Sequence, residues 1–240
     1  MSLNSASRVV VLGGTSGIGL AVAQAASEAG AAVVVASRNP DSVTAALKKL
    51  PDNAVGHSVD ASSTESMRAF FDEIGQFDHL AYTAADTLTS TPLEDYTPQK
   101  AQTFFNLRVV YAFEAVRLAV PHLRPGGSIT LTSGTAAFKG GPGWLLGCAA
   151  AGAIASGARS LAVELAPLRV NAVAPGVIRS PLWSGMTEAE QQQMYADTGA
   201  SLPLGRVGEV QDAAKAYIQL MDQDYATGIV SVIDGGTLLA

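Results

Sequence analysis

Short apolar runs rich in β-branched residues alternate with longer segments of helical periodicity along the whole chain. Runs of the first kind predict buried strands, and apolar residues spaced three and four apart predict helices. Strands are expected at Val9–Leu12, Val33–Val35, Val55–Val59, Asp78–Thr83, Ser128–Thr132, Arg169–Val173 and Ile229–Ile233. Helices are expected at Gly17–Ala29, Pro40–Leu50, Ser63–Ile74, from Thr97 onward, at Trp144–Ala158 and at Glu209–Met221.

This alternation predicts an α/β fold. Apolar strands joined by crossover helices are typical of a parallel sheet whose two faces are both covered. We therefore expect a Rossmann-type, doubly wound parallel sheet of about seven strands, with helices on both faces. No proline-rich, serine-rich or charged run divides the 240 residues. Residues 1–240 are predicted to form a single domain, with a cofactor-binding part at about 1–130 and an active-site and substrate-lid part at about 131–240.

Composition and charge exclude several classes of partner. The net charge is -6 and no basic cluster appears, so we expect no nucleic acid and no anionic membrane as partner. The single cysteine, Cys148, cannot form an internal disulfide and fits a reducing compartment. We see no secretory signal and expect a cytoplasmic protein. The apolar stretch Trp144–Ala158 is shorter than the ~20 residues of a membrane span, and it predicts a buried helix.

A glycine-rich segment, Leu12–Gly19, follows the first predicted strand and opens the first predicted helix. Glycines permit a tight turn and let backbone N–H groups approach a pyrophosphate, and the helix N-terminus adds favourable partial charge. An ordinary glycine turn is the alternative interpretation. Three glycines at this spacing and in this context favour a dinucleotide site, and the sequence offers no comparable metal-ligating constellation.

The spacing of Gly13, Gly17 and Gly19 resembles that of the short-chain dehydrogenase/reductase (SDR) family. Further matches are Asp60 after the third strand, Asn106 in the fourth helix, and the segments Ser160–Leu165, Arg169–Gly176 and Asp234–Gly236. The resemblance implies a nicotinamide cofactor, a small-molecule substrate or ligand, and a homodimer or homotetramer. It also implies cofactor contacts from the matched glycines and Asp60, and from Thr15, Ser16, Ile18, Ala84, Pro175, Gly176, Ile178 and Ser180.

The end of the second strand predicts the phosphate preference. An acidic residue there would bond the ribose 2′-OH and repel a 2′-phosphate. This chain has Ser37 at the usual acidic position, followed by Arg38, whose guanidinium can pair with a phosphate. We therefore predict NADP(H) in preference to NAD(H). The alternative is that Arg38 is a solvated surface charge.

The resemblance fails at the family's three catalytic positions. Family reductases use a tyrosine as proton donor, a lysine four residues later that lowers its pKa, and a serine some thirteen residues earlier. Counting back from Arg159–Ala162 places the tyrosine position at Gly147 and the lysine position at Ala151. Counting forward from Gly127 places the serine position at Gly134, and the two counts agree without a gap.

Few other residues are candidates for chemistry. Ser133 precedes the vacant serine position, and alternation along a strand would point it away, although a bent strand end would keep it available. Asn106 matches the family's active-site asparagine, in a catalytic or a structural role. Tyr82 is expected to be a packed core aromatic with a bonded hydroxyl. Cys148 is expected to be a small buried thiol rather than a nucleophile. Tyr96 has Lys100 at the family spacing, but it lies at a helix start in another part of the fold.

Two interpretations of function remain. Small residues at all three positions should enlarge the cavity beside the nicotinamide, unless Trp144 or Phe138 fills it. The chain is then either an NADP(H)-dependent oxidoreductase acting on an activated carbonyl, quinone or enone, or a catalytically degenerate family member. In the first case a hydroxyl of Thr132, Ser133 or Thr135, or a water, would complete the proton transfer. In the second case the protein binds dinucleotide as a sensor or non-catalytic subunit.

Overall fold

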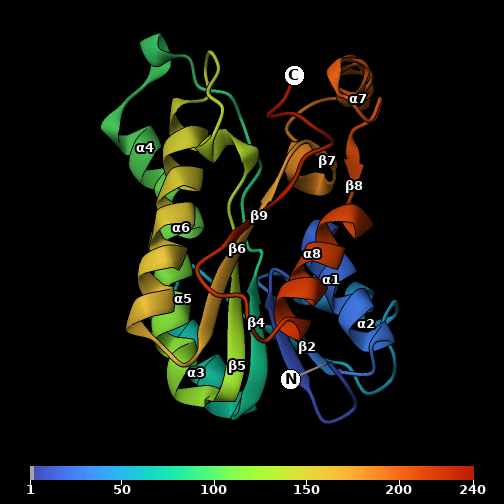
Figure 1. Ribbon diagram of the computed structural model, residues 1–240, viewed down its shortest axis with the longest axis vertical. Coiled ribbons are helices and arrows are strands. Elements are labelled where there is room, and N and C mark those ends of the chain that lie inside the picture. Colours follow the sequence, from blue (N-terminus) through green and yellow to red (C-terminus); the bar gives the residue numbers. More distant parts are fainter. Residues whose placement is uncertain (1–2) are drawn as a thin grey trace.

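Seven parallel strands form one twisted sheet in the computed structural model, which describes residues 3–240 (Figure 1). Their order across the sheet is β3-β2-β1-β4-β5-β6-β9. The strands are β1 (Arg8–Leu12), β2 (Ala32–Ser37), β3 (Val55–Ser58), β4 (Phe77–Tyr82), β5 (Leu123–Thr132), β6 (Arg169–Pro175) and β9 (Val230–Ile233). Two short strands, β7 (Ile178–Arg179) and β8 (Gly208–Glu209), pair separately. The predicted doubly wound fold with about seven parallel strands is confirmed.

Helices cover both faces of this sheet. Figure 1 shows α3, α5 and α6 on one side and α1, α2 and α8 on the other. The helices are α1 (Gly17–Glu28), α2 (Pro40–Leu47), α3 (Thr64–Ile74), α4 (Pro98–Phe105), α5 (Tyr111–Ala119), α6 (Leu145–Glu164), α7 (Glu188–Ser201) and α8 (Val210–Asp222). Each layer has its own apolar core, one built on Leu80, Ile129 and Phe71 and the other on Val9, Val33 and Tyr217.

The strand order reverses between β1 and β4, and this reversal positions the site. From β1 the chain proceeds outward to β2 and β3, and then crosses back to β4 on the other side of β1. The connections that leave the carboxyl ends of β1 and β4 therefore turn to opposite faces of the sheet. A crevice opens between them, which is where open α/β sheets bind their ligands.

The predicted long fourth helix is interrupted. Thr97 caps it as expected, because its side chain accepts a hydrogen bond from the Lys100 N–H, and Pro98 occupies the first turn. After α4, however, the chain makes a π-helical turn over Asn106–Val110 before α5 begins. Single π-helical turns insert one extra residue and are frequent at functional sites. The turn begins at Asn106, the candidate active-site asparagine.

The predicted buried helix is buried on one face only. Helix α6 packs Ala150, Ile154 and Ala158 into the core, whereas Val163 and Leu145 are 81% and 50% exposed. Of the helices in residues 3–240, α6 alone has the length and apolar character of a possible membrane span. The predicted buried helix over Trp144–Ala158 is thus buried on its core-facing side, and its outer face is exposed.

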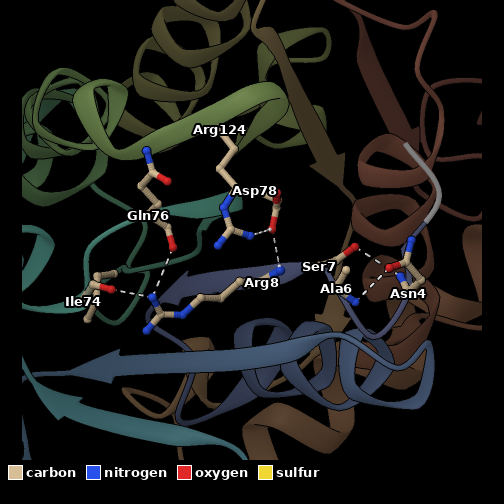
Figure 2. A network of polar contacts seen from close by, with 8 residues as sticks. All are labelled: Asn4, Ala6, Ser7, Arg8, Ile74, Gln76, Asp78 and Arg124. Carbon is tan, nitrogen blue, oxygen red and sulfur yellow. Dashed lines mark hydrogen bonds and ion pairs between the residues drawn. The ribbon is translucent and has the colours of Figure 1, made fainter.

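A polar network fixes the opposite edge of the sheet, at the amino ends of the strands. The Asp78 carboxylate accepts hydrogen bonds from the Arg8 backbone N–H at 2.7 Å and from the Arg124 guanidinium at 3.0 Å. The Arg8 guanidinium donates to the carbonyl oxygens of Ile74 and Gln76 (Figure 2). These contacts join the starts of β1, β4 and β5, so the edge that carries no candidate site residue is held by side-chain bonds.

One buried histidine makes stability depend on pH. His79 is 1% exposed and its Nδ1 lies 2.8 Å from the Ser128 hydroxyl oxygen. Burial lowers the pKa of His79 to about 4, against an ordinary value near 6.5. As pH falls below about 6.5, the unfolded chain gains a proton here that the folded chain does not, until pH reaches about 4.

Because of His79, we therefore expect the unfolding free energy to fall by about 2 kcal/mol as the pH is lowered from about 7.5 to about 5. Urea unfolding at the two pH values measures this loss, and His79→Gln should remove most of it. An equal pH dependence in the wild type and the variant would contradict the assignment.

Candidate functional site

One cavity of about 1110 Å³ runs along the carboxyl ends of the strands. It extends from the glycine-rich segment, across the gap between β1 and β4, to the start of α6. The structure brings every sequence-predicted site residue to its lining. They are Gly13, Thr15, Ser16, Gly17, Ile18, Gly19, Ser37, Arg38, Asp60, Ala84, Asn106, Ser133, Gly134, Gly147, Ala151, Pro175, Gly176, Ile178 and Ser180.

The glycine-rich turn packs directly on the end of β4. A Cβ on Gly19 would lie 2.2 Å from the Gly13 carbonyl oxygen and 2.4 Å from the Thr83 hydroxyl oxygen. Gly13 has φ +87, and a Cβ there would lie 2.6 Å from the Ala84 backbone nitrogen. The Thr83 hydroxyl donates a hydrogen bond to the Leu12 carbonyl at 3.0 Å. Leu12 has no side-chain hydroxyl, so Thr83 provides the hydroxyl bond of this turn. No side chain larger than hydrogen fits at Gly13 or Gly19.

The turn delivers the N-terminus of α1 to the cavity. Ser16 is the N-cap residue, but its side chain makes no capping hydrogen bond. The first-turn N–H groups of α1 are thus left without a side-chain partner in the described structure, beside Ser16, Gly17 and Ile18 in the cavity lining. Such a helix end is an anion site, because its free N–H groups and its partial positive charge point outward.

Arg38 and Asp60 stand at the far end of the cavity, after β2 and β3. Arg38 is exposed and forms no ion pair with any residue of the described range 3–240. The Asp60 carboxylate accepts from the Ser62 hydroxyl at 2.6 Å and from the Ser62 N–H at 2.9 Å. These two bonds lower the pKa of Asp60, and the nearby charge of Arg38 acts in the same direction. A cation without a carboxylate partner is therefore available next to the ribose end of a dinucleotide site.

At the other end of the cavity lie Gly134, Gly147 and Ala151, the residues that the sequence register assigns to the family's catalytic positions. A Cβ on Gly134 would lie 4.0 Å from the Ala151 Cβ, with the Pro175 carbonyl oxygen at 3.8 Å and nothing nearer. Gly147 and Ala151 are one helical turn apart on the cavity face of α6. The expected extra space exists at Gly134 and Ala151. It is restricted at Gly147, because the Trp144 ring lies 3.2 Å from where a Cβ would stand.

Most hydroxyls near these positions already have partners. The Thr132 hydroxyl donates to the Tyr82 carbonyl at 2.6 Å and lies 2.6 Å from the hydroxyl of the fully buried Tyr217. The Ser133 hydroxyl donates to the Ala151 carbonyl at 2.8 Å and so ties the end of β5 to α6. Thr135 also lines the cavity, and its hydroxyl has no bonding partner among the described residues. Of the three candidate hydroxyls, Thr135 is the one with a free proton.

Tyr82 is the packed aromatic that its sequence position predicts. It is 2% exposed, and its hydroxyl donates to the Leu107 carbonyl at 2.7 Å. Burial raises the pKa of Tyr82 well above its ordinary value. The phenol is therefore held neutral and bonded within the fold, whereas the side chain of Asn106 on the neighbouring π-helical turn is exposed to the cavity.

Several functional positions had no clear sequence signal. Trp144, one of the two residues expected to be able to fill the cavity, lies in its lining against Gly147, whereas Phe138 does not line it. Thr83 meets the glycine turn because β1 and β4 are adjacent. Arg108 lines the cavity and donates to the carbonyl oxygens of Asp86 and Thr87, and burial lowers its pKa. Lys139 donates to the carbonyls of Thr237 and Ala240. Arg108 and Lys139 had no sequence signal, whereas Thr83 ends the predicted strand that faces the glycine-rich segment.

A doubly wound parallel sheet with an anion-binding glycine turn at its switch point defines a dinucleotide-binding protein of the Rossmann type. The family model described as enoyl-(acyl carrier protein) reductase matches residues 13–237. The short-chain dehydrogenase/reductase ATR9 of Stachybotrys chlorohalonatus is 34% identical, with 96% of each chain covered. The chain belongs to the short-chain dehydrogenase/reductase family.

Solved structures show the same architecture. A small-chain dehydrogenase in complex with NADPH is 33% identical, with a TM-score of 0.83, and the match covers 98% of this chain and 99% of that one. MalC reductase/Diels-Alderase from Malbranchea aurantiaca is 29% identical, with a TM-score of 0.90, and the match covers 99% and 98%. An NADPH-bound oxidoreductase from Pseudomonas aeruginosa, described as containing an atypical catalytic center, is 28% identical, with a TM-score of 0.90 and coverage of 99% and 98%.

The close contact at Gly19 can be tested by adding a methyl group at that position. We expect Gly19→Ala to lower the unfolding free energy by about 2 kcal/mol or more, because the added methyl overlaps the Gly13 carbonyl and the Thr83 hydroxyl. Gly152→Ala is the matched control. Gly152 is also helical, and nothing lies within 4 Å of its Cβ position.

The control should stabilise the protein by about 0.5–1 kcal/mol, through helix propensity alone. Denaturant unfolding of the two variants provides the measurement. Equal effects of the two alanines would show that the turn does not need its close backbone contact.

Proposed function

We propose that this protein is an NADP(H)-dependent oxidoreductase whose active site lacks the family's Ser, Tyr and Lys, and which reduces an activated carbonyl, quinone or enone. One observation carries this proposal. One cavity is lined at one end by residues that fit a dinucleotide, and at the other end by Gly134, Gly147 and Ala151, which the register assigns to the family's catalytic positions. The site can bind and orient a hydride donor, but none of the three residues can supply a proton.

The residues of the cleft fit NADP(H). The α1 N-terminus and the backbone of Ser16–Ile18 would bind the pyrophosphate, and the unpaired Arg38 beside Ser37 would bind the 2′-phosphate. Gly176, Ile178 and Ser180 lie where the nicotinamide end would reach, on the segment after β6. When bound, the cofactor supplies a hydride to the substrate. The protein supplies position and electrostatic environment.

The absence of a proton donor at these positions restricts which substrates can be reduced. Loss of a general acid costs about 10²–10⁴ in rate, which is prohibitive for an unactivated ketone. Hydride addition to a quinone yields a hydroquinone monoanion, and addition to an enone yields an enolate, so the negative charge is delocalised in both products. Such an anion can take its proton afterwards from water or from the Thr135 hydroxyl, the free hydroxyl of this region.

Relatives support this direction. The Pseudomonas aeruginosa relative binds NADPH and is described as having an atypical catalytic center, and MalC is described as a reductase and Diels-Alderase. Both share more than nine-tenths of their length with this chain. An unusual catalytic center on this fold is thus compatible with bound NADPH, and the fold also serves a reductase with a second kind of chemistry.

A second function is favoured by the same three positions. With no ionisable group at residues 134, 147 and 151, the protein would bind dinucleotide without turnover, as a sensor or a non-catalytic subunit. In either case we propose a cytoplasmic homodimer or homotetramer. The exposed outer face of α6, which carries Ala149, Ser156 and Val163, supports self-association, because small residues let another helix approach closely.

Arg38 provides the test of cofactor choice. We expect wild-type protein to bind NADPH more tightly than NADH. Arg38→Ala should weaken NADPH binding by about 10–100-fold, the usual value of a charge-assisted hydrogen bond, and leave NADH binding nearly unchanged. Calorimetric titration gives the four dissociation constants. Tighter NADH binding by the wild type would contradict the preference.

Turnover decides between the two functions. We expect NADPH oxidation with quinones and enones and little with simple ketones.

Gly134→Phe, which would fill the open space beside Ala151, should abolish NADPH oxidation, while NADPH binding and its dependence on Arg38 persist. Thr135→Val should slow turnover less than 10-fold if water substitutes for the hydroxyl, and more if it does not. NADPH binding without oxidation of any acceptor would establish the sensor or subunit function.

A further inference from the structure

Two tryptophans form an aromatic corner at the substrate end of the cavity. The Trp144 and Trp183 rings are 6.5 Å apart and nearly perpendicular, at 81°. Trp183 is 6% exposed, and its indole N–H donates to the Ile178 carbonyl at 2.9 Å, so this ring is fixed. Trp144 is half-buried and lines the cavity. Its indole N–H makes no hydrogen bond within residues 3–240.

Glycines on both sides make room for the Trp144 ring. A Cβ on Gly147 would lie 3.2 Å from Trp144 Cε3 and 3.8 Å from Cζ3, and a Cβ on Gly141 would lie 3.4 Å from Cδ1. Neither glycine has a positive φ, so backbone conformation does not explain their presence. The indole therefore takes up the direction in which any side chain at position 147 would extend.

The backbone holds Trp144 where it is. Its N–H donates to the Gly141 carbonyl at 3.1 Å, and its carbonyl accepts from the Cys148 N–H at 2.8 Å, at the start of α6. The preceding turn is anchored in its own right, since the Thr91 N–H donates to the Gly143 carbonyl at 2.8 Å. Backbone hydrogen bonds thus fix the position of the Trp144 backbone, and the lack of a side chain at Gly147 permits the position of its ring.

We propose that Gly147 and Trp144 act as a pair, in which the indole occupies the space that a side chain at position 147 would fill. We further propose that Trp144 determines specificity for planar aromatic acceptors. The inference rests on the proposed function, and it narrows the substrate to a ring-fused quinone or enone. Trp144 packs against the cluster of Trp183, Tyr195 and Val207 and also lines the cavity, so a flat ligand there can stack on its indole. Offset stacking adds about 0.5–1.5 kcal/mol beyond area burial, and a puckered, saturated ring cannot gain it.

The test compares two ligands of similar size and different shape. A naphthoquinone methylated at both free quinone carbons, so that Cys148 cannot add to it, is the planar probe, and a decalone is the puckered one. Calorimetry on the wild type, with and without NADP⁺, should show preference for the quinone. Trp144→Leu should weaken quinone binding about 10-fold and leave decalone binding within 2-fold, and Trp144→Phe should retain most of the preference.

Two matched controls separate stacking from general damage. Phe138 is a 47% exposed aromatic of the same segment that does not line the cavity, and Phe138→Leu should change neither affinity. Gly147→Leu should displace the indole, reduce the near-ultraviolet circular dichroism of the tryptophan pair and weaken quinone binding as Trp144→Leu does. Gly152→Leu, on the same helix but with open space at its Cβ, should do neither.

The combination Trp144→Leu/Gly147→Leu should bind the quinone no more weakly than Trp144→Leu alone, because both changes remove one interaction. Additive losses, equal weakening of both ligands, or wild-type affinity in Trp144→Leu would each overturn the proposal. Binding is measured without turnover. An inactive protein that still prefers the planar ligand refutes the oxidoreductase function alone, and an active one without this preference refutes the role of Trp144 alone.

Discussion

The contact between the glycine turn and the end of β4 is the constraint on which the cofactor cleft depends. Because β1 and β4 are neighbours in the sheet, the turn that follows β1 must pass directly over Thr83 and Ala84. A Cβ at Gly13 or Gly19 would fall within 3 Å of that backbone or of the Thr83 hydroxyl. The glycines therefore serve first to join two strands, and the same close approach directs the N-terminus of α1 into the cavity. Binding of an anion there uses a backbone arrangement that the fold already requires.

At the other end of the cavity, the absence of side chains has two different consequences. Gly134 and Ala151 leave open space, and Gly147 makes room for an indole. The hydroxyls of Thr132 and Ser133 are meanwhile used in holding β5 to β4, α8 and α6. These hydrogen bonds tie the end of β5 to its neighbours, and Gly134, Gly147 and Ala151 carry no side-chain group that can donate a proton. We therefore propose an acceptor that is already activated as the substrate.

The sequence allowed the fold and the lining of the cavity to be predicted because both depend on local signals. Apolar runs mark strands, and Gly13, Gly17 and Gly19 mark the turn that follows the first one. The interruption at Asn106 could not be predicted, since a π-helical turn has no composition of its own. The apolar stretch Trp144–Ala158 predicted a buried helix, but small apolar residues on all its sides did not reveal which face of α6 is exposed. The pairing of Trp144 with Trp183 and the contact of Thr83 with the glycine turn join segments distant in the chain, which spacing alone does not reveal.

The proposed function requires that hydride still leaves the cofactor in this site. The most direct measurement uses NADPH deuterated at the transferred position and a ring-fused enone, with the product analysed by mass spectrometry. Deuterium should appear on the β-carbon of the reduced product, together with a primary isotope effect on NADPH oxidation in a single turnover. Tight NADPH binding with no deuterium in any product would contradict the account and leave a dinucleotide-binding protein without oxidoreductase activity.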